Sequence, residues 1–423
     1  MNRFLTIALV LVVFCASAQR KSRKTEQQNQ NTPTKPLVLK PVVRAISSKY
    51  IIKDSTAVRI FLECDIEYLK PENVLQQVKE HFRISWLVQP DYGVRERLAY
   101  GKLELNEQNC FLRDEKLILT FEVPKVRTYP TGLLLTEIFE LESAKKATND
   151  LTINFYGNHL SDRYALFLTD LNTPTFRNYI NQQETFQIRS INAVPSDVFL
   201  VRYQHEFEPA QSPMATTLRP LPRSMKIEQV VKARTNEPIK LEKEGLYMAV
   251  EDTATMRNGF GFVLVDNRFP KLTRPEKLVK PVHYMSSNKE IQALAENPNF
   301  KQALDRYFLS LTSGNQVLAK RIIKSYYTRV EDANRLFTSY KEGWKTDKGM
   351  VYIILGPPNK VQRSRDREIW LYSQNQNFSE IIFTFNRKPN QFTENNYELV
   401  RYPEYQAYWY PFVEAWRTGN VLE

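Results

Sequence analysis

Glycine, cysteine and histidine are scarce in this chain. Of 423 residues, 12 are glycine, three are cysteine and four are histidine. So few glycines leave little room for the glycine-rich loops that hold nucleotide phosphates, and the sequence contains no Walker loop and no nucleophile elbow. The four histidines lie far apart and do not form a metal-ligand pattern. We therefore predict no metal and no other cofactor.

Two of the three cysteines, Cys64 and Cys110, lie in the part that we expect to fold. In an oxidising compartment they could form a disulfide, and closing a loop of that length is worth about 4 kcal/mol in the entropic model. Two buried free thiols are the alternative, because two cysteines do not make a disulfide framework. The sequence leaves this choice open.

The expected folded part also lacks a strong charge of one sign. The formal net charge is +12, but residues 1–44 hold eight Lys and Arg against one acid, so that the rest of the chain carries only about +5. We therefore expect no nucleic-acid partner, and weak contact with an anionic surface only from residues 20–44.

Only the N-terminus contains a long apolar run. After a basic start, the run extends from Phe4 to Phe14 and is followed by small residues of a cleavage site that ends at Ala18. This pattern predicts a secretory signal peptide over residues 1–18. Lipidation of Cys15 is the alternative, although a bulky residue precedes that cysteine. No later stretch reaches the ~18 apolar residues of a membrane span.

The segment after the signal peptide, residues 19–45, is polar, basic and proline-containing. It has no apolar periodicity over most of its length, which is typical of a disordered linker. A basic arm that contacts an anionic lipid or polysaccharide surface is the alternative.

Short strands dominate the next two stretches. Apolar and polar residues alternate over residues 57–68 and 82–88, which is the period of a strand with one buried face. Further apolar segments of strand length follow, separated by turn residues. We predict two tandem immunoglobulin-like β-sandwich modules, over residues 46–155 and 156–284.

Helical periodicity begins near residue 286 and predicts an α+β domain over residues 285–423. The predicted helices cover residues 288–295, 300–311 and 316–340. The predicted strands cover residues 350–355, 368–372, 380–385 and 397–401. An aromatic helix over residues 405–416 is predicted to cover the last edge strand.

One motif lies between the long helix and the first of these strands. A glycine fits the helix end, where a left-handed backbone is often needed, and Asp347 suits a tight turn. The apolar run then ends at Gly-Pro-Pro, which removes amide donors. The motif consists of Gly343, Trp344, Thr346, Asp347, Gly349, Gly356, Pro357 and Pro358, with Trp370 and Tyr372 in a later strand.

This motif resembles the signature of the GWxTD-domain family, exported envelope proteins typical of Bacteroidota. The resemblance covers roughly residues 290–423 and implies an α+β domain preceded by β-sandwich modules. It implies a place in the periplasm or on the periplasmic face of the outer membrane. It brings no catalytic residue with it, because the family has no agreed activity.

A second resemblance is to small α+β lipoproteins that assist outer-membrane protein assembly. It consists of Gly-Pro after a short apolar run, then a Trp-x-Tyr strand and a Phe-x-Phe strand. The apolar run is helical in those lipoproteins, whereas we predict a strand over residues 350–355.

Asp347 is the candidate for catalysis. A carboxylate beside an aromatic wall can have a raised pKa and act as an acid or base, whereas a carboxylate that accepts bonds from turn amides stays structural. Trp344 is likewise either a platform for a carbohydrate or a buried lid. The predicted binding residues are Trp344, Thr346, Asp347, Trp370 and Tyr372. The predicted structural residues are Gly343, Gly349, Gly356, Pro357 and Pro358.

Two classes of function remain at this point. The first is a non-enzymatic envelope protein that docks to another envelope protein through the domain over residues 285–423, in outer-membrane assembly or secretion. The alternative is an envelope glycan-binding module, or a hydrolase of glycan or peptide centred on Asp347. Burial of Trp344 and Asp347 would favour the first class.

Overall fold

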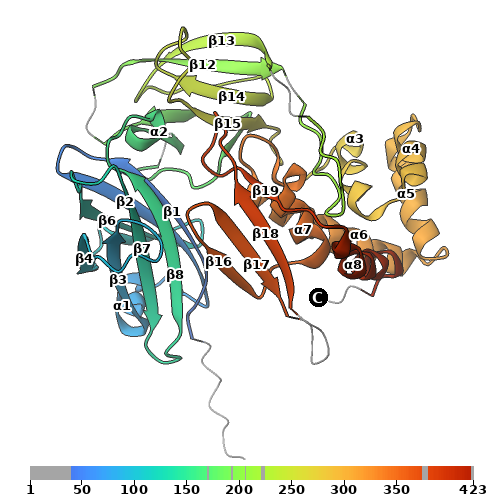
Figure 1. Ribbon diagram of the computed structural model, residues 1–423, viewed down its shortest axis with the longest axis horizontal. Coiled ribbons are helices and arrows are strands. Elements are labelled where there is room, and N and C mark those ends of the chain that lie inside the picture. The colour runs from blue at the N-terminus through green and yellow to red at the C-terminus, as the bar shows by residue number, and fades with distance from the viewer. Residues whose placement is uncertain are drawn as a thin grey trace, which may run out of the picture. The chain divides into compact units, whose positions relative to one another are not determined.

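Two antiparallel sheets form the first module and share one apolar core (Figure 1). The computed structural model describes residues 40–168, 171–191, 194–204, 206–220, 224–373 and 380–420. The predicted signal peptide and the predicted linker up to residue 39 lie outside these residues. From Lys40 onward the chain forms one compact unit.

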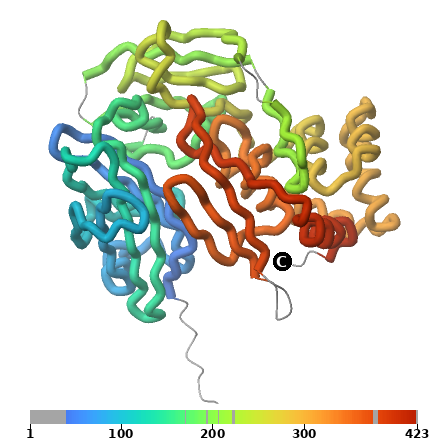
Figure 2. The backbone as a smooth tube through the Cα atoms, in the orientation of Figure 1, coloured from blue at the N-terminus to red at the C-terminus, as the bar shows by residue number. Residues whose placement is uncertain are grey.

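The two sheets have the strand orders β1-β2-β6-β5 and β4-β3-β7-β8. The tight reversal between β7 and β8 can be followed in Figure 2. The strands are β1 (Val42–Ile52), β2 (Ala57–Glu67), β3 (Phe82–Gln89), β4 (Ala99–Lys102), β5 (Cys110–Arg113), β6 (Lys116–Pro124), β7 (Thr131–Glu140) and β8 (Lys146–Asn154), with helix α1 (Val74–His81) before β3.

The alternating pattern in β2 produces this sandwich. Val58, Ile60 and Leu62 are fully buried between the sheets, as a period of two residues requires. The prediction of a β-sandwich is therefore confirmed. The predicted linker is too long at its C-terminal end, because β1 begins at Val42 and the Val43 amide donates to Glu140 Oε1 at 3.0 Å.

Cys64 and Cys110 are free and buried. They lie on β2 and β5, on either side of β6, opposite Leu117 and Leu119. Burial raises the pKa of the Cys110 thiol to about 11. The two cysteines thus contribute to the core as small apolar side chains.

The second module is a mixed sheet with the order β10-β15-β14-β12-β13 and a separate pair, β9-β11. Strand β10 runs parallel to β15, and the other pairs are antiparallel. Its elements are α2 (Leu160–Arg163), β9 (Ala165–Leu168), β10 (Tyr179–Asn181), β11 (Phe186–Arg189), β12 (Asp197–Gln204), β13 (Lys226–Arg234), β14 (Gly245–Val250) and β15 (Phe260–Val265).

Strands β14 and β15 are buried on both faces. Tyr247 and Phe262 pack with β9 and β11 in one core, whereas Leu246, Met248 and Val263 belong to the core of the C-terminal helices. This sheet is therefore a middle layer shared by two cores, and its strands read as continuous apolar runs.

Helices and a four-stranded antiparallel sheet, ordered β16-β17-β18-β19, form the C-terminal region within the described residues. The helical elements are α3 (Pro275–Leu278), η1 (Pro281–Met285), α4 (Asn288–Ala295), α5 (Phe300–Leu311), α6 (Gln316–Phe337), η2 (Gly343–Lys345), α7 (Asp347–Leu355), η3 (Pro403–Tyr405) and α8 (Gln406–Thr418). The strands are β16 (Lys360–Arg363), β17 (Arg367–Tyr372), β18 (Ile381–Arg387) and β19 (Tyr397–Leu399).

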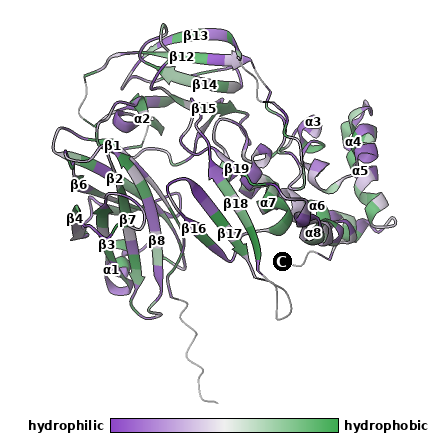
Figure 3. Cartoon of the chain, viewed as in Figure 1, coloured by the Kyte–Doolittle hydropathy of each residue, from purple (hydrophilic) through white to green (hydrophobic). Residues whose placement is uncertain are grey.

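The predicted strand over residues 350–355 is wrong, because this segment is helix α7. The Thr346 hydroxyl accepts a hydrogen bond from the Gly349 amide at 3.0 Å and caps the helix, with Asp347 in the first turn. The apolar run, which has the hydrophobic colour in Figure 3, is buried on nearly every side. It therefore shows neither the period of a strand nor that of a half-exposed helix.

Helix α7 lies at the centre of the C-terminal core. It packs on α6, on β19 and on α8. Indole nitrogen Nε1 of Trp416 in α8 donates to the Ile354 carbonyl at 3.0 Å. The segment predicted as an aromatic helix over residues 405–416 is helical, as η3 and α8, but it packs on α7 and η1, so that the predicted cover of the last edge strand is not confirmed.

Within the part of the chain that is described, no helix has the length and apolar character needed to cross a bilayer.

Candidate functional site

The motif begins as a tight turn pressed against α6. A β-carbon on Gly343 would lie 2.0 Å from the Ala333 carbonyl oxygen, and one on Gly349 would lie 2.0 Å from the Gly343 carbonyl oxygen. The Gly343 amide donates to the Thr338 hydroxyl at 2.9 Å. These glycines are thus required by close backbone approach. The predicted left-handed helix end at Gly343 is wrong, since α6 already ends at Phe337.

Trp344 is buried, with 1% of its surface exposed. Its amide donates to Asn334 Oδ1 at 3.1 Å, and its indole nitrogen donates to Glu342 Oε2 at 2.9 Å. Its carbonyl accepts from the Tyr284 hydroxyl at 2.7 Å. Every polar group of this tryptophan therefore has a partner inside the protein.

Asp347 joins the start of α7 to the end of the last sheet. Its Oδ2 atom accepts from the Leu399 amide at 2.7 Å, and its Oδ1 atom pairs with Arg401 at 2.6 Å. Both side chains of this pair are less than a tenth exposed. Thr346 is half-buried, and besides capping α7 its hydroxyl donates to the Gly343 carbonyl at 2.7 Å.

The two aromatic residues of the later strand are also buried. Trp370 Nε1 donates to Glu368 Oε1 at 2.6 Å, and the Tyr372 hydroxyl donates to the Gly356 carbonyl at 2.9 Å. Gly356 ends α7 with a positive φ of 86°, and Pro357 follows where the helix has stopped. With its neighbour Pro358 this proline terminates a helix in place of the predicted strand.

The predicted binding residues face the interior in two groups: Trp344, Thr346 and Asp347 form a cluster at the start of α7, whereas Trp370 and Tyr372 lie on β17. Asn334 and Tyr284 complete the cluster, and the pattern of the motif did not point to either residue. Asn334 could have been found from its position four residues after Val330, on the apolar stripe of α6. A polar side chain on a buried stripe needs a hydrogen-bond partner inside the protein.

A second ionic cluster surrounds Glu368, which is 6% exposed. Lys348 lies 3.0 Å and Arg363 lies 3.1 Å from its Oε2 atom. Burial opposes ionisation of Glu368, yet these two cations outweigh it and hold the pKa of that carboxyl below its usual range. Arg363 also pairs with Asp150 of β8 at 3.1 Å and so links β16 to the first module.

A half-open depression of about 670 Å³, here called the motif groove, lies beside the motif turn. Its charged lining residues include Glu206, Arg274, Lys277, Lys280, Glu342 and Lys345. Lys345 lies 3.2 Å from Glu342 and 3.8 Å from Glu206. Opposite charges therefore alternate along the groove, and the turn that carries Trp344 forms part of its wall.

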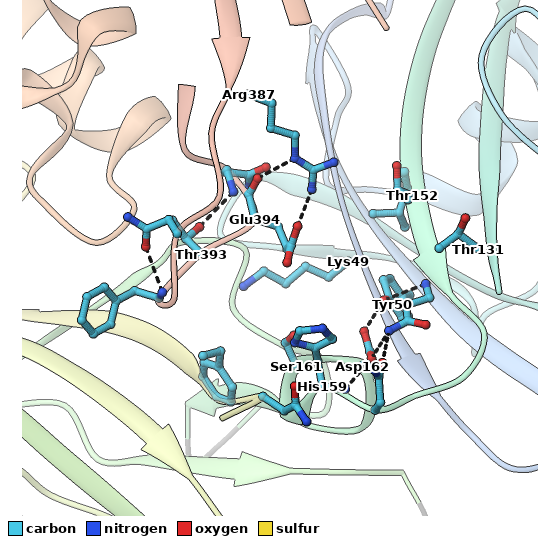
Figure 4. A pocket seen from close by; sticks show the side chains of 18 of the residues that line it. Lys49, Tyr50, Thr131, Thr152, His159, Ser161, Asp162, Arg387, Thr393 and Glu394 are labelled. Atoms are coloured by element: carbon cyan, nitrogen blue, oxygen red, sulfur yellow. Dashed lines mark hydrogen bonds and ion pairs between the residues drawn. The ribbon is translucent and has the colours of Figure 1, made fainter. Parts of the chain in front are cut away.

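A larger depression of about 1010 Å³, here called the polar cavity, lies among β1, β8, the segment around α2, the turn before β15 and the loop from Arg387 to Tyr397 (Figure 4). Lys49 of β1 extends into it between Glu394 and the side chains of Ser161 and His159. Among the described residues Lys49 has no ion pair and no hydrogen bond. No sequence motif marks it, because its lining residues come from many separate segments between Ser48 and Tyr397.

Lys49 and Lys341 share one property. Burial lowers the pKa of each ammonium group to about 8. At pH 7.5 roughly a quarter of each would then be uncharged, against about one in a thousand for an ordinary lysine.

We expect these two lysines to react early with an amine-selective acylating reagent, with rates that rise up to pH 8 and then level off. Peptide mass spectrometry of the folded and the urea-unfolded protein over pH 6–10 measures this. In the unfolded protein the same two lysines should follow the ordinary lysine profile. Rates that keep rising to pH 10 in the folded protein would contradict the lowered pKa values.

No group of three or more His, Cys, Asp or Glu side chains that could hold a metal occurs in the described ranges.

Known proteins offer one informative match. No curated protein matches the chain. A solved structure of Dpr2 Ig1-Ig2 in complex with DIP-Theta Ig1-Ig3 is similar over 54% of this chain and 100% of the other at 11% identity, but the TM-score of 0.18 is too low to carry an argument. The GWxTD domain model matches residues 245–418.

This match begins forty residues before the domain predicted from position 285, and it includes β14 and β15. The inclusion agrees with the packing, since one face of these strands lies in the core of the C-terminal helices. The remaining predicted domain limits stay predictions. The chain carries a GWxTD domain over residues 245–418, and Gly343, Trp344, Thr346 and Asp347 are the residues that give the domain its name.

Proposed function

We propose that this chain is an exported, non-enzymatic cell-envelope protein that acts as an interaction component through its GWxTD domain, in outer-membrane assembly or secretion. The signal-peptide pattern of residues 1–18 supports export, to the periplasm or to the periplasmic face of the outer membrane. Anchoring through a lipid on Cys15 is the alternative.

One observation carries the proposal. The polar groups of the motif are used inside the protein, where they hold the turn between α6 and α7, and that turn forms part of the wall of the motif groove. In this proposal Trp344 and Asp347 position the groove, and the buried Lys345 holds Glu342 and Glu206 at its wall. Glu276, Lys277 and Lys280 contact the partner. Charges of alternating sign mainly determine which protein partner binds and in which orientation, and they contribute less to the binding affinity.

Helix α7 supports the suggested process. The run from Met350 to Leu355 is helical, followed by Gly-Pro and by the Trp-x-Tyr strand β17. The lipoproteins that assist outer-membrane protein assembly have the same order of elements. The strand predicted over residues 350–355 would have distinguished this chain from them, and that segment is helical.

A hydrolase centred on Asp347 has less support. Both carboxylate oxygens are engaged, by the Leu399 amide and by Arg401, within a site that is less than a tenth exposed. A general acid or base must reach the proton that it transfers. No substrate atom can approach Asp347 without displacing β19 or Arg401.

Site-specific photo-crosslinking in native envelopes tests the docking proposal. A photoreactive residue replaces Glu276 or Lys280, which are exposed at the motif groove, and Val317, which is 80% exposed on α6, serves as the control. We expect one shared protein adduct from the two groove positions and none from the control. An equal adduct from Val317, or retention on peptidoglycan without any protein adduct, would refute the proposal.

A further inference from the structure

The polar cavity contains an amine, Lys49 Nζ, that has no ion pair and no hydrogen bond within the described residues. The carboxylate that favours its charged form, Glu63 on β2, itself pairs with Arg113 at 3.0 Å. Lys49 lies on β1, paired in register with Phe61 of β2, and its side chain projects into the cavity. A charge held among other side chains without a partner costs stability, so such an arrangement is uncommon unless a ligand completes it.

The carboxylates around Lys49 are already engaged. Asp162 accepts from the Tyr50 hydroxyl at 2.5 Å and from Asn154 Nδ2 at 2.8 Å. Glu394 pairs with Arg387 at 2.6 Å. Asp150 and Asp91, farther along the wall, pair with Arg363 and Arg365 respectively. The charge that remains for a ligand is therefore positive.

The walls around Lys49 are rich in neutral hydrogen-bonding groups. Several hydroxyl and amide side chains that line the cavity make no side-chain hydrogen bond within the described residues: Thr131, Thr152, Ser161, Asn258, Gln391 and Asn395. Free hydroxyls and amides can both donate and accept, which matches the hydroxyl groups of a sugar.

An aromatic ring stands at the same cavity. Tyr156, just after β8, lines it and is 67% exposed. An exposed tyrosine ring presents a flat apolar face with a polar edge, on which the C–H face of a sugar ring can stack. The volume of about 1010 Å³ exceeds the need of one sugar ring and lies at the upper end of the usual range for ligand sites.

From these observations we propose that the polar cavity binds a carboxylate-bearing oligosaccharide, with Lys49 Nζ as the partner of the carboxylate, the free hydroxyls and amides as partners of the sugar hydroxyls, and Tyr156 as the stacking surface. A phospholipid fits less well, because its acyl chains need a mainly apolar lining. This site is separate from the motif groove and does not depend on the docking proposal.

Calorimetric titration of the full chain tests the assignment. The probes are oligosaccharides that end in glucuronate, galacturonate, muramate or sialate, each with its neutral methyl ester, and inorganic phosphate. We expect at least one acidic probe to bind, with its methyl ester at least about tenfold weaker, because a hydrogen bond to a charged group is lost. Lack of binding by all four acidic probes at millimolar concentration would overturn the proposal.

Matched variants locate the contact. Lys49→Met should weaken the acidic probe about tenfold or more and should leave the affinity for its methyl ester unchanged, while Lys320→Met on the exposed face of α6 should change neither affinity. Lys49→Met removes no internal partner, so its melting temperature should equal or exceed that of the wild type. Thr152→Val provides a second, uncharged test, with weaker binding of both acid and ester.

Two results would refute the site. The first is unchanged acidic-probe binding in folded Lys49→Met. The second is equal binding of inorganic phosphate and of the acidic oligosaccharide, which would indicate an unselective anion site. Groove crosslinks should be the same in wild type and Lys49→Met, so that failure of this proposal and failure of the docking proposal are distinguishable.

Discussion

Replacing Gly343 by alanine is expected to cost more than about 4 kcal/mol of unfolding free energy, a loss that few single substitutions reach. The new β-carbon would lie 2.0 Å from the Ala333 carbonyl oxygen, which belongs to the backbone of α6 and cannot rotate away. The turn would have to move outward, and the hydrogen bond from the Trp344 amide to Asn334 would be lost with it. Equilibrium unfolding in urea, followed by tryptophan fluorescence, measures the loss.

Gly314→Ala is the control for this substitution. Gly314 has a positive φ of 86°, but a β-carbon there meets no atom within 4 Å. We expect a cost of only about 1–2 kcal/mol, from the left-handed backbone alone. If Gly343→Ala unfolded at the same urea concentration as Gly314→Ala, close packing of the motif turn on α6 would not be the reason for its glycine.

Asp347→Ala is the second substitution with a large expected effect, about 3–5 kcal/mol. It leaves Arg401 as a buried cation without its carboxylate, and removal of one partner of a buried ion pair is strongly destabilising. It also leaves the Leu399 amide without its acceptor. The same urea titration measures the loss.

The double variant Asp347→Ala/Arg401→Met separates the two causes. Removing both charges should recover part of the loss, and the difference between the single and the double variants gives the coupling energy of the pair. Asp366→Ala is the control: it removes an exposed carboxylate from the turn before β17 and should not change the free energy of unfolding measurably. Full stability of Asp347→Ala together with loss of a measurable turnover would instead identify Asp347 as a catalytic residue.

Strands β2 and β3 were predictable because apolar residues alternate with polar ones along them, so that one face of each strand lies in the core. In β2 the apolar residues recur at every second position, from Val58 to Ile66, and this pattern by itself specifies a strand and the side that faces the core. Helix α6 was predictable for the same reason, with a buried stripe that includes Ile322, Tyr326 and Val330.

Helix α7 was not predictable from its pattern. Its residues are β-branched or large and apolar, which favours a strand, and burial on almost every side removes the alternation that would reveal a helix. The decisive local signal was Thr346 with Asp347 at the N-terminus, which caps a helix. The same two residues also suit a tight turn, and only the conformation of the segment that follows distinguishes a helix cap from a turn.

The partners of the motif residues also lay beyond prediction. Asp347 pairs with Arg401, fifty-four residues later, and the Trp344 carbonyl accepts from Tyr284, sixty residues earlier. A single sequence contains no periodicity that relates such distant positions. The burial of the motif, which separates a structural from a catalytic role, is therefore a property of the packed domain.

The sequence by itself determined the sandwich strands, the main helices and the motif that identifies the GWxTD domain, because alternation, helical stripes and fixed spacing are local properties of a chain. The tertiary structure alone decided that the motif faces inward, that β14 and β15 serve two cores, and that Lys49 stands unpaired in the polar cavity. Each of those facts depends on segments brought together from distant parts of the chain, and contacts of this kind form only when the apolar faces of several elements are buried against one another.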